Sequence, residues 1–358
     1  PSVIGDEDII GNAYQYMIEQ FASDAGKKGG EFYTPTMASE LLARLVKPQE
    51  NDRIYDPTCG SGSLLIRVAK QVPNNKVAIY GQERNGATHS LALMNMYLHG
   101  IDDANIEWGD TLANPLHLED GKLMKFQKIV ANPPFSLDKW AMGFAGESNS
   151  DSKFKMEASL DPHRRFEWGV PPTSKGDYAF VQHMLYSLAE NGTMATILPH
   201  GVLFRGASEG KIRQQIIEMN LLDAVIGLPE GLFYGTSIPA CVLVFKKGRT
   251  RKDVVFIDAS AEGNYEKGKN QNKLREEDLQ KIVATYEKRE TIDKYSYVAT
   301  IEEIKENDFN LNIPRYVDTF EEEEPVDMEA VKQNIADIKK ELAVVEAEME
   351  KYLKELGL

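Results

Sequence analysis

The sequence predicts a doubly wound α/β domain with a mostly parallel sheet, and three observations lead to this prediction. From residue 53 onward, short apolar strand candidates alternate with helix candidates, starting with strands at Arg53–Asp56 and Val77–Gly81. Such alternation is typical of βαβ units, in which helices cover both faces of a sheet. Glycines and acidic residues follow successive strand candidates, and ligands bind at that edge of open α/β sheets. The chain has 358 residues, which is enough for one large domain with appendages.

The elements follow one another along the chain. Residues 8–46 carry apolar residues at helical spacing, interrupted by a Gly-rich loop at 26–35. We therefore divide the chain into a helical lead-in with its loop (1–50), a main domain (51–318) and a C-terminal helix (319–358). One further helix is predicted to start at Leu64, and others cover Met37–Val46, Ala87–Leu98, Tyr178–Ala189 and Lys211–Met219. Further strands are predicted over Ile106–Asp110, Lys128–Ala131, Gly192–Leu198, Leu222–Gly227 and Ala240–Phe245.

One long segment, residues 136–175, breaks the alternation. It is rich in Gly, Ser, Asn and Asp, and loops of this length are uncommon unless they are functional or disordered. We expect a mobile aromatic loop here, able to close over a large substrate. Its aromatic residues are Trp140, Phe144, Phe154, Phe166 and Trp168.

Composition limits the setting and the partners. No apolar run approaches the roughly 20 residues that span a bilayer, so we expect no membrane segment. The two cysteines, Cys59 and Cys241, lie far apart without metal-ligand spacing, which favours a reducing, cytoplasmic setting. The net charge of −15 is unusual for a protein that binds nucleic acid alone, because phosphate contacts need a basic surface. If this chain acts on nucleic acid, a partner must supply that surface.

The C-terminal segment has a pattern of its own. After an acidic run and Pro325, apolar residues recur in alternating steps of three and four, which is a heptad pattern typical of a coiled coil. The partner helix could belong to this chain, to a second copy or to a different protein. The apolar positions are Met328, Val331, Ile335, Ile338, Leu342, Val345, Met349, Tyr352 and Leu356.

The residues Asn132, Pro133, Pro134 and Phe135 directly follow the predicted strand at 128–131. Consecutive prolines restrict the backbone and remove two donors, so the chain leaves the strand in one extended shape. That shape can direct the Asn132 amide oxygen and the Pro133 carbonyl at one –NH2 group, while Phe135 stacks on its ring. Taken alone, the same four residues could equally form a structural turn.

Acidic and Gly-rich sites at three other strand ends support the binding interpretation. An acidic residue before a Gly turn can bind a cationic amino group. An acidic residue at the end of the second strand can accept hydrogen bonds from ribose hydroxyls, and a third, after the next strand, can accept a hydrogen bond from an adenine amine. Each is weak alone, but together they form a row at one sheet edge. In chain order they are Asp56 with Gly60, Ser61, Gly62 and Ser63, then Glu83, then Asp110.

Taken together, these motifs resemble the N6-adenine DNA methyltransferases, and more closely the modification subunit of type I restriction–modification systems. Residues 30–35 (Gly-Glu-Phe-Tyr-Thr-Pro) look like the family's cofactor loop, and 192–204 look like the strand after its catalytic turn. Residues 228–239 look like its late antiparallel β-hairpin region. The resemblance covers roughly 8–318, without the helical domain that usually comes before it in the family.

The resemblance implies a Rossmann-like fold that binds S-adenosylmethionine and methylates a flipped adenine in double-stranded DNA. It implies no metal and no covalent nucleophile, so that Cys59 is a packing residue and the histidines are structural. The partner that reads DNA would be a specificity subunit docked on residues 325–358, with a second methyltransferase copy and a restriction or translocase subunit as further partners. The loop over the cofactor would be Glu31, Phe32, Tyr33, Thr34, Pro35 and Thr36.

Two alternatives stay open from the residues. Asn-Pro-Pro-aromatic turns also serve adenine methylation in RNA and glutamine methylation in proteins, because an amide and a ring amine present similar –NH2 groups. The chain could also be an inactive methyltransferase fold that acts only through its C-terminal helix.

Overall fold

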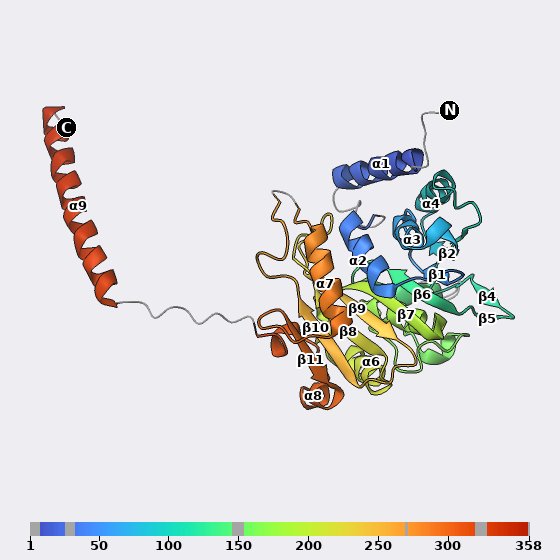
Figure 1. Cartoon of the computed structure of the whole chain (residues 1–358). Helices are drawn as coiled ribbons and strands as arrows, with labels where there is room; N and C mark the ends of the chain where they lie inside the picture. Colours follow the sequence, from blue (N-terminus) through green and yellow to red (C-terminus); the bar gives the residue numbers. More distant parts are fainter. Residues whose placement is uncertain (1–7, 26–32, 145–153, 269–270, 319–327, 357–358) are drawn as a thin grey trace. The chain divides into compact units, whose positions relative to one another are not determined.

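The structure is a computed structural model that describes residues 8–25, 33–144, 154–268, 271–318 and 328–356 (Figure 1). It divides into two compact units, Pro1–Asp318 and Thr319–Leu358. The first unit contains the sheet and its covering helices. The second contains one described helix, α9 (Met328–Glu355).

The described part of the first unit is built on a nine-stranded mixed sheet with the strand order β11-β10-β8-β9-β7-β6-β1-β2-β3. The half from β7 to β3 is parallel throughout, as predicted. A two-stranded hairpin, β4 (Leu118–Glu119) and β5 (Lys122–Leu123), lies apart from it. The nine strands are β1 (Arg53–Asp56), β2 (Ala78–Glu83), β3 (Asn105–Trp108), β6 (Phe126–Ala131), β7 (Leu188–Pro199), β8 (Leu222–Gly227), β9 (Ala240–Lys246), β10 (Asp253–Asp258) and β11 (Ser296–Thr300).

The other half of the sheet contains the antiparallel pairs. β9 lies between β7 and β8 and runs antiparallel to both, so that β8 and β9 form the late hairpin that the resemblance implied. β10 runs parallel to β8, and β11 pairs antiparallel with β10 at the edge. The sequence analysis did not predict β10, β11 or the helix between them.

Helices cover both faces of the sheet. On one face lie α2, α3, α4 and α7, and on the other α5, α6 and α8. α1 lies beside α4 (Figure 1). The helices are α1 (Ile9–Ala25), α2 (Thr36–Val46), α3 (Ser63–Ala69), α4 (Gly86–Leu98), α5 (Asp177–Ser187), α6 (Ala207–Glu218), α7 (Glu276–Lys288) and α8 (Ile301–Glu306).

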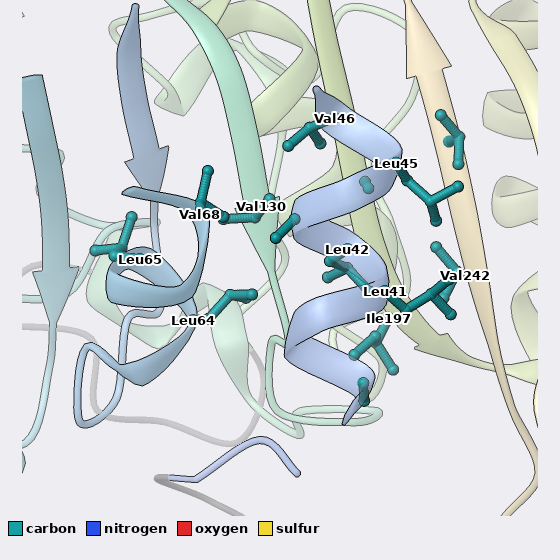
Figure 2. Packing of buried hydrophobic residues seen from close by; sticks show 14 of the residues in the cluster. Leu41, Leu42, Leu45, Val46, Leu64, Leu65, Val68, Val130, Ile197 and Val242 are labelled. Atoms are coloured by element: carbon teal, nitrogen blue, oxygen red, sulfur yellow. The ribbon is translucent and has the colours of Figure 1, made fainter. Parts of the chain in front are cut away.

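The strand pleat explains how one sheet serves two cores. Successive side chains of a strand point to opposite faces, so Ile54 joins the core under α2 while Tyr55 joins the core under α5. Figure 2 shows the first core, where Leu41, Leu42 and Leu45 of α2 lie near residues of α3 and of the central strands. Burial of these large apolar side chains holds α2 against the sheet.

Most predicted elements are confirmed, with small shifts of their ends. The helix predicted over Tyr178–Ala189 ends at Ser187, because β7 begins at Leu188. The strand predicted over Ile106–Asp110 ends at Trp108, which leaves Asp110 in the turn that follows it. α6 begins at Ala207, earlier than Lys211, where the apolar pattern becomes clear.

The described parts of the 136–175 segment pack against the second core. Trp140 and Phe166 are buried, and Phe144, Phe154 and Trp168 pack partly buried around them. Trp140 and Phe166 are therefore core residues rather than a surface that could close over a substrate. The mobility of the segment stays a prediction, and residues 145–153 lie outside the described structure.

The predicted C-terminal helix is confirmed as α9. Its described heptad side chains are exposed, among them Ile338 (63%), Leu342 (54%) and Val345 (60%). The coiled-coil pairing itself stays a prediction. Among the described helices, none combines the length and apolar character that a bilayer crossing requires.

Candidate active site

The carboxyl ends of β1, β2, β3 and β6 bring Asp56, Glu83, Asp110 and Asn132 to one edge of the sheet. Two adjoining cavities share Thr58 and Asn132 in their walls. The larger, of about 620 Å³, is also lined by Glu83, Asp110 and Pro134. The smaller is lined by Thr34, Tyr33, Asp56, Gly60, Ser61 and Ser63.

The turn after β1 is held by Asp56. Its Oδ1 accepts hydrogen bonds from the Thr58 amide at 2.9 Å and from Thr58 Oγ1 at 3.4 Å. Burial raises the pKa of Asp56 to about 7, partly opposed by these hydrogen bonds and assisted by the nearby Glu83. Gly60 and Gly62 have φ values of 55° and 75°, a region that glycine adopts without strain. The backbone can therefore bend tightly beside the cavity.

The hydroxyls of Ser61 and Ser63 are buried and lie 2.9 Å apart. Asn95 of α4 donates to the Ser61 carbonyl at 2.8 Å, which ties the turn to the helix. Asn95 was not predicted, because nothing in a helix sequence marks one buried amide as a support for a distant turn.

Glu83 joins the ends of β1 and β2. Its Oε2 accepts from the Gly60 amide at 3.1 Å, and its Oε1 accepts from the Asn85 amide at 2.7 Å. Burial raises the pKa of this carboxyl. Glu83 is thus fixed in orientation and lines the larger cavity.

Asp110 has a structural role in the turn after β3. Its Oδ1 accepts from the amides of Leu112 and Ala113 at 3.0 and 3.1 Å, as a capping residue does. Its Oδ2 lies 3.7 Å from Arg84 Nη1, and the residue also lines the larger cavity. The capping role and a ligand-binding role are therefore compatible.

Asn132 lies between the two cavities. Its Nδ2 donates to Thr34 Oγ1 at 3.1 Å, whereas its Oδ1 is buried without a hydrogen-bond partner in the described structure. A buried acceptor without a donor is destabilising by roughly 1–3 kcal/mol, so this oxygen is suited to a ligand N–H. This is the geometry expected of an amine-orienting group.

The residues on either side of Asn132 are placed as follows. Pro133 is buried, Pro134 is exposed at the cavity wall, and Phe135 is half-buried. The Phe135 ring packs edge-to-face on Phe233, with centroids 5.9 Å apart at 73°. This contact from the β8–β9 connection was not predicted, and it fixes the plane of the Phe135 ring.

The predicted cofactor loop is described only in part. Tyr33 is buried and its hydroxyl lies 2.9 Å from Thr36 Oγ1, while Pro35 precedes α2. Thr34 contacts Asn132, so the described end of the loop reaches the site. Glu31 and Phe32 lie outside the described residues.

A buried arginine behind the site was missed by the sequence analysis. Arg165 is fully buried, pairs with Asp161 at 2.8 Å, and donates to the Thr111 and Leu112 carbonyls at 3.1 and 2.5 Å. It therefore supports the turn that carries Asp110. The only signal in the sequence is an Asp and an Arg four residues apart in a loop, which is too common to interpret.

Other polar candidates have structural positions. His183 lies 3.0 Å from the Tyr55 hydroxyl, and burial together with the Arg165 guanidinium lowers its pKa well below the ordinary value. Cys59 is buried, and burial raises the pKa of its thiol, in keeping with the packing role expected for it. Among the described residues, no group of three His, Cys, Asp or Glu side chains could hold a metal ion.

The sheet order, the Gly turn after β1 and the acidic residue ending β2 are features of the Rossmann-like methyltransferase fold that the resemblance implied. S-adenosylmethionine is the cofactor that the resemblance implies. The site fits a ligand of this kind for two reasons. The cavity of about 620 Å³ has the size of small-molecule sites, and its wall includes the carboxylates of Glu83 and Asp110, which can accept hydrogen bonds from polar ligand groups.

The chain belongs to the N-6 DNA methylase family, whose sequence profile matches residues 5–325. It is 37% identical over 348 residues to the methylase subunit of the type I restriction enzyme MpnII of Mycoplasma pneumoniae, covering 92% of this chain and 61% of that protein. It is 36% identical to the HindI methylase subunit of Haemophilus influenzae, covering 100% of this chain and 80% of that protein.

A solved structure also shows similarity to a type I methyltransferase subunit. The crystal structure of the type I restriction-modification methyltransferase subunit from Streptococcus thermophilus superposes with a TM-score of 0.78 at 43% identity, covering 88% of this chain and 65% of that one. The chain thus spans less than two thirds of the Mycoplasma and Streptococcus proteins.

Proposed function

We propose that this chain transfers a methyl group from S-adenosylmethionine to N6 of adenine in double-stranded DNA, as the modification subunit of a type I restriction–modification system. The observation that carries the proposal is Asn132, which lines both cavities and whose buried Oδ1 has no hydrogen-bond partner among the described residues. The relatives named as type I restriction enzyme methylase subunits support the same reading.

The chemistry of the target amine explains the need for this turn. The lone pair of adenine N6 is delocalised into the ring, so the amine is a weak nucleophile. Asn132 Oδ1 and the Pro133 carbonyl accept its two protons and direct the lone pair along the line of attack. Phe135 stacks on the base, which must be flipped out of the duplex because N6 lies inside the stack.

The carboxylates at the sheet edge hold the cofactor in this proposal. Glu83 accepts from the ribose hydroxyls, Asp110 accepts from the adenine amine, and Asp56 faces the methionyl ammonium. The Gly turn with Gly60, Ser61, Gly62 and Ser63 lets the methionyl part approach the backbone, and residues 31–36 cover it. When bound, S-adenosylmethionine supplies an electrophilic methyl carbon on a sulfonium and leaves as a thioether. The bond from N6 to carbon forms as the bond from sulfur to carbon breaks, and the released proton passes to water.

Replacing Asn132 with Ala tests the proposal. We expect methylation of DNA to fall by at least about 100-fold, because one of two acceptors for the amine is lost. S-adenosylmethionine affinity should stay within about twofold, since Asn132 faces the transferred group rather than the ribose. Methyl incorporation into adenine-unmethylated DNA and calorimetric binding are the two measurements. Retained methylation in the folded variant would refute the role of Asn132.

The partners follow from charge and from α9. The net charge of −15 calls for a basic, DNA-reading partner, which we propose is a specificity subunit docked on the heptad face within residues 325–358. A second methyltransferase copy and a restriction or translocase subunit are further proposed partners. The cytoplasmic setting expected from cysteine usage stays a prediction.

The alternative substrates make different predictions. RNA or a glutamine-containing protein would be methylated without a DNA-reading partner, and an inactive module would not bind S-adenosylmethionine. The match to a DNA methylase family favours DNA.

A further inference from the structure

The residue directly after the catalytic turn has an unusual backbone. Ser136 has φ 50°, in the left-handed region that residues other than glycine rarely adopt. Pro133 and Pro134 cannot donate backbone hydrogen bonds. Within the described structure, the Ser136 amide is the first backbone donor after these prolines that has an acceptor. The turn therefore depends on an outside group to fix the point where it ends.

That outside group is Asp177, the first residue of α5. Its Oδ1 accepts from the Ser136 amide at 2.7 Å, its Oδ2 lies 3.4 Å from Ser136 Oγ, and the residue is only 1% exposed. The preceding Gly176 donates to the Leu137 carbonyl at 3.0 Å. A Cβ on Gly176 would lie 3.1 Å from Trp140 Cβ, so glycine allows this close approach.

Asp177 is itself held by an arginine from another strand end. Arg205, beyond β7, donates to Asp177 Oδ2 and lies 3.4 Å from Ser136 Oγ. Its Nε pairs with Glu209 of α6 at 2.8 Å. The Arg205 carbonyl accepts from Arg213 at 2.8 Å, which anchors the arginine to α6. The end of the catalytic turn is thus tied to α5, α6 and the end of β7.

We propose that Asp177 and Arg205 are positioning residues for methyl transfer. They hold Ser136 in its left-handed conformation and thereby set the direction of the Asn132 oxygen and the Phe135 ring. This inference rests on the proposed function. Neither residue lines either of the two cavities, so their effect on the reaction passes through the backbone of the turn.

The position of the turn matters because methyl transfer needs a line of attack. A displacement of about 1 Å at a reacting group lowers rates on the order of 100-fold, even when binding is intact. Loss of the Asp177 carboxylate would leave Ser136 free to relax toward the right-handed region. We therefore expect loss of turnover without loss of cofactor affinity.

The test compares Asp177→Ala with Asp223→Ala in the complex that supports DNA methylation. Asp223 is a matched control, because it is also buried, is paired with Lys246, Arg249 and Arg289 at 3.0 Å each, and is outside both site cavities. Folded sites are counted by S-adenosylmethionine binding, and kcat is expressed per folded site. The milder variant Asp177→Asn keeps an oxygen for the Ser136 amide and guards against a failure of Asp177→Ala to fold.

We expect Asp177→Ala to lower kcat about 10- to 100-fold while the S-adenosylmethionine affinity is unchanged. The kcat of Asp177→Asn should lie between those of Asp177→Ala and the unmodified chain. Asp223→Ala should keep the kcat of the unmodified chain. Equal kcat values for the Asp177 variants and the control would overturn the inference, as would a loss confined to cofactor affinity. If the unmodified chain with its partner does not methylate DNA, the proposed function fails instead, and the two failures are therefore distinct.

Discussion

The raised pKa of Asp56 predicts a pH-dependent affinity for S-adenosylmethionine. Burial raises this pKa from 3.8 to about 7, so the carboxyl is largely neutral at pH 6 and largely ionised at pH 7.5. If the methionyl ammonium binds only the ionised form, a single pKa of 7 gives ionised fractions of about 0.09 and 0.76 at these two pH values. The affinity should then rise about eightfold from pH 6 to pH 7.5.

The same shift has a consequence for stability without cofactor. The folded state keeps a proton on Asp56 that the unfolded state loses near pH 4, so the stability associated with that proton is present at low pH and is lost as the pH rises through about 7. At about 1.4 kcal/mol per pKa unit, the loss is on the order of 4 kcal/mol. A bound ammonium would offset it, so the thermal shift from S-adenosylmethionine should be larger at pH 7.5 than at pH 6.

Isothermal titration calorimetry at the two pH values measures this directly, with Asp56→Asn as the control. The amide keeps the shape of the side chain and cannot titrate, so its affinity should be weak and nearly independent of pH. An unmodified chain with the same affinity at both pH values would refute the reasoning. An Asp56→Asn variant that still gains affinity with pH would assign the effect to another group, of which Glu83 is the nearest carboxyl with a raised pKa.

Two further predictions concern the Gly turn and α9. Gly62→Ala should lower the free energy of unfolding by about 2 kcal/mol, mainly because φ is 75°, while the Met96 Cε atom 2.8 Å from the new Cβ ends a flexible side chain that can shift. Gly100→Ala, at φ 69° with nothing within 4 Å, isolates the backbone part and should be milder in denaturant unfolding. Leu342→Asp on the heptad face should abolish partner-dependent methylation and co-purification of the partner while S-adenosylmethionine affinity is unchanged. Val344 is also apolar and is 60% exposed, but it lies off the heptad positions, so Val344→Asp should retain partner-dependent methylation and co-purification. Equal losses in the two variants would contradict docking on the heptad face.

Local patterns predicted the parallel half of the sheet well. The apolar run 129–131 in β6 is short, fully buried and followed by a turn, so pattern and structure agree. Asp56, Glu83 and Asp110 could be placed at one edge because parallel strands share the side on which they end.

The supports of the site could not be predicted in the same way. Arg165 binds carbonyls more than 50 residues earlier in the chain, and Asp177 binds an amide 41 residues earlier. Such contacts depend on the folded arrangement of loops, and their residue types are those of ordinary surface positions. β10, α7 and β11 were not predicted either.

The place of β6 in the sheet has a mechanical consequence. Both of its neighbours, β1 and β7, run parallel to it, and five strands lie on one side and three on the other. The hydrogen-bond ladder on both sides makes its amides among the last expected to exchange with solvent. Asn132, which we propose orients the target amine, therefore directly follows a strand that is paired on both sides, and motion in the surrounding loops need not displace it.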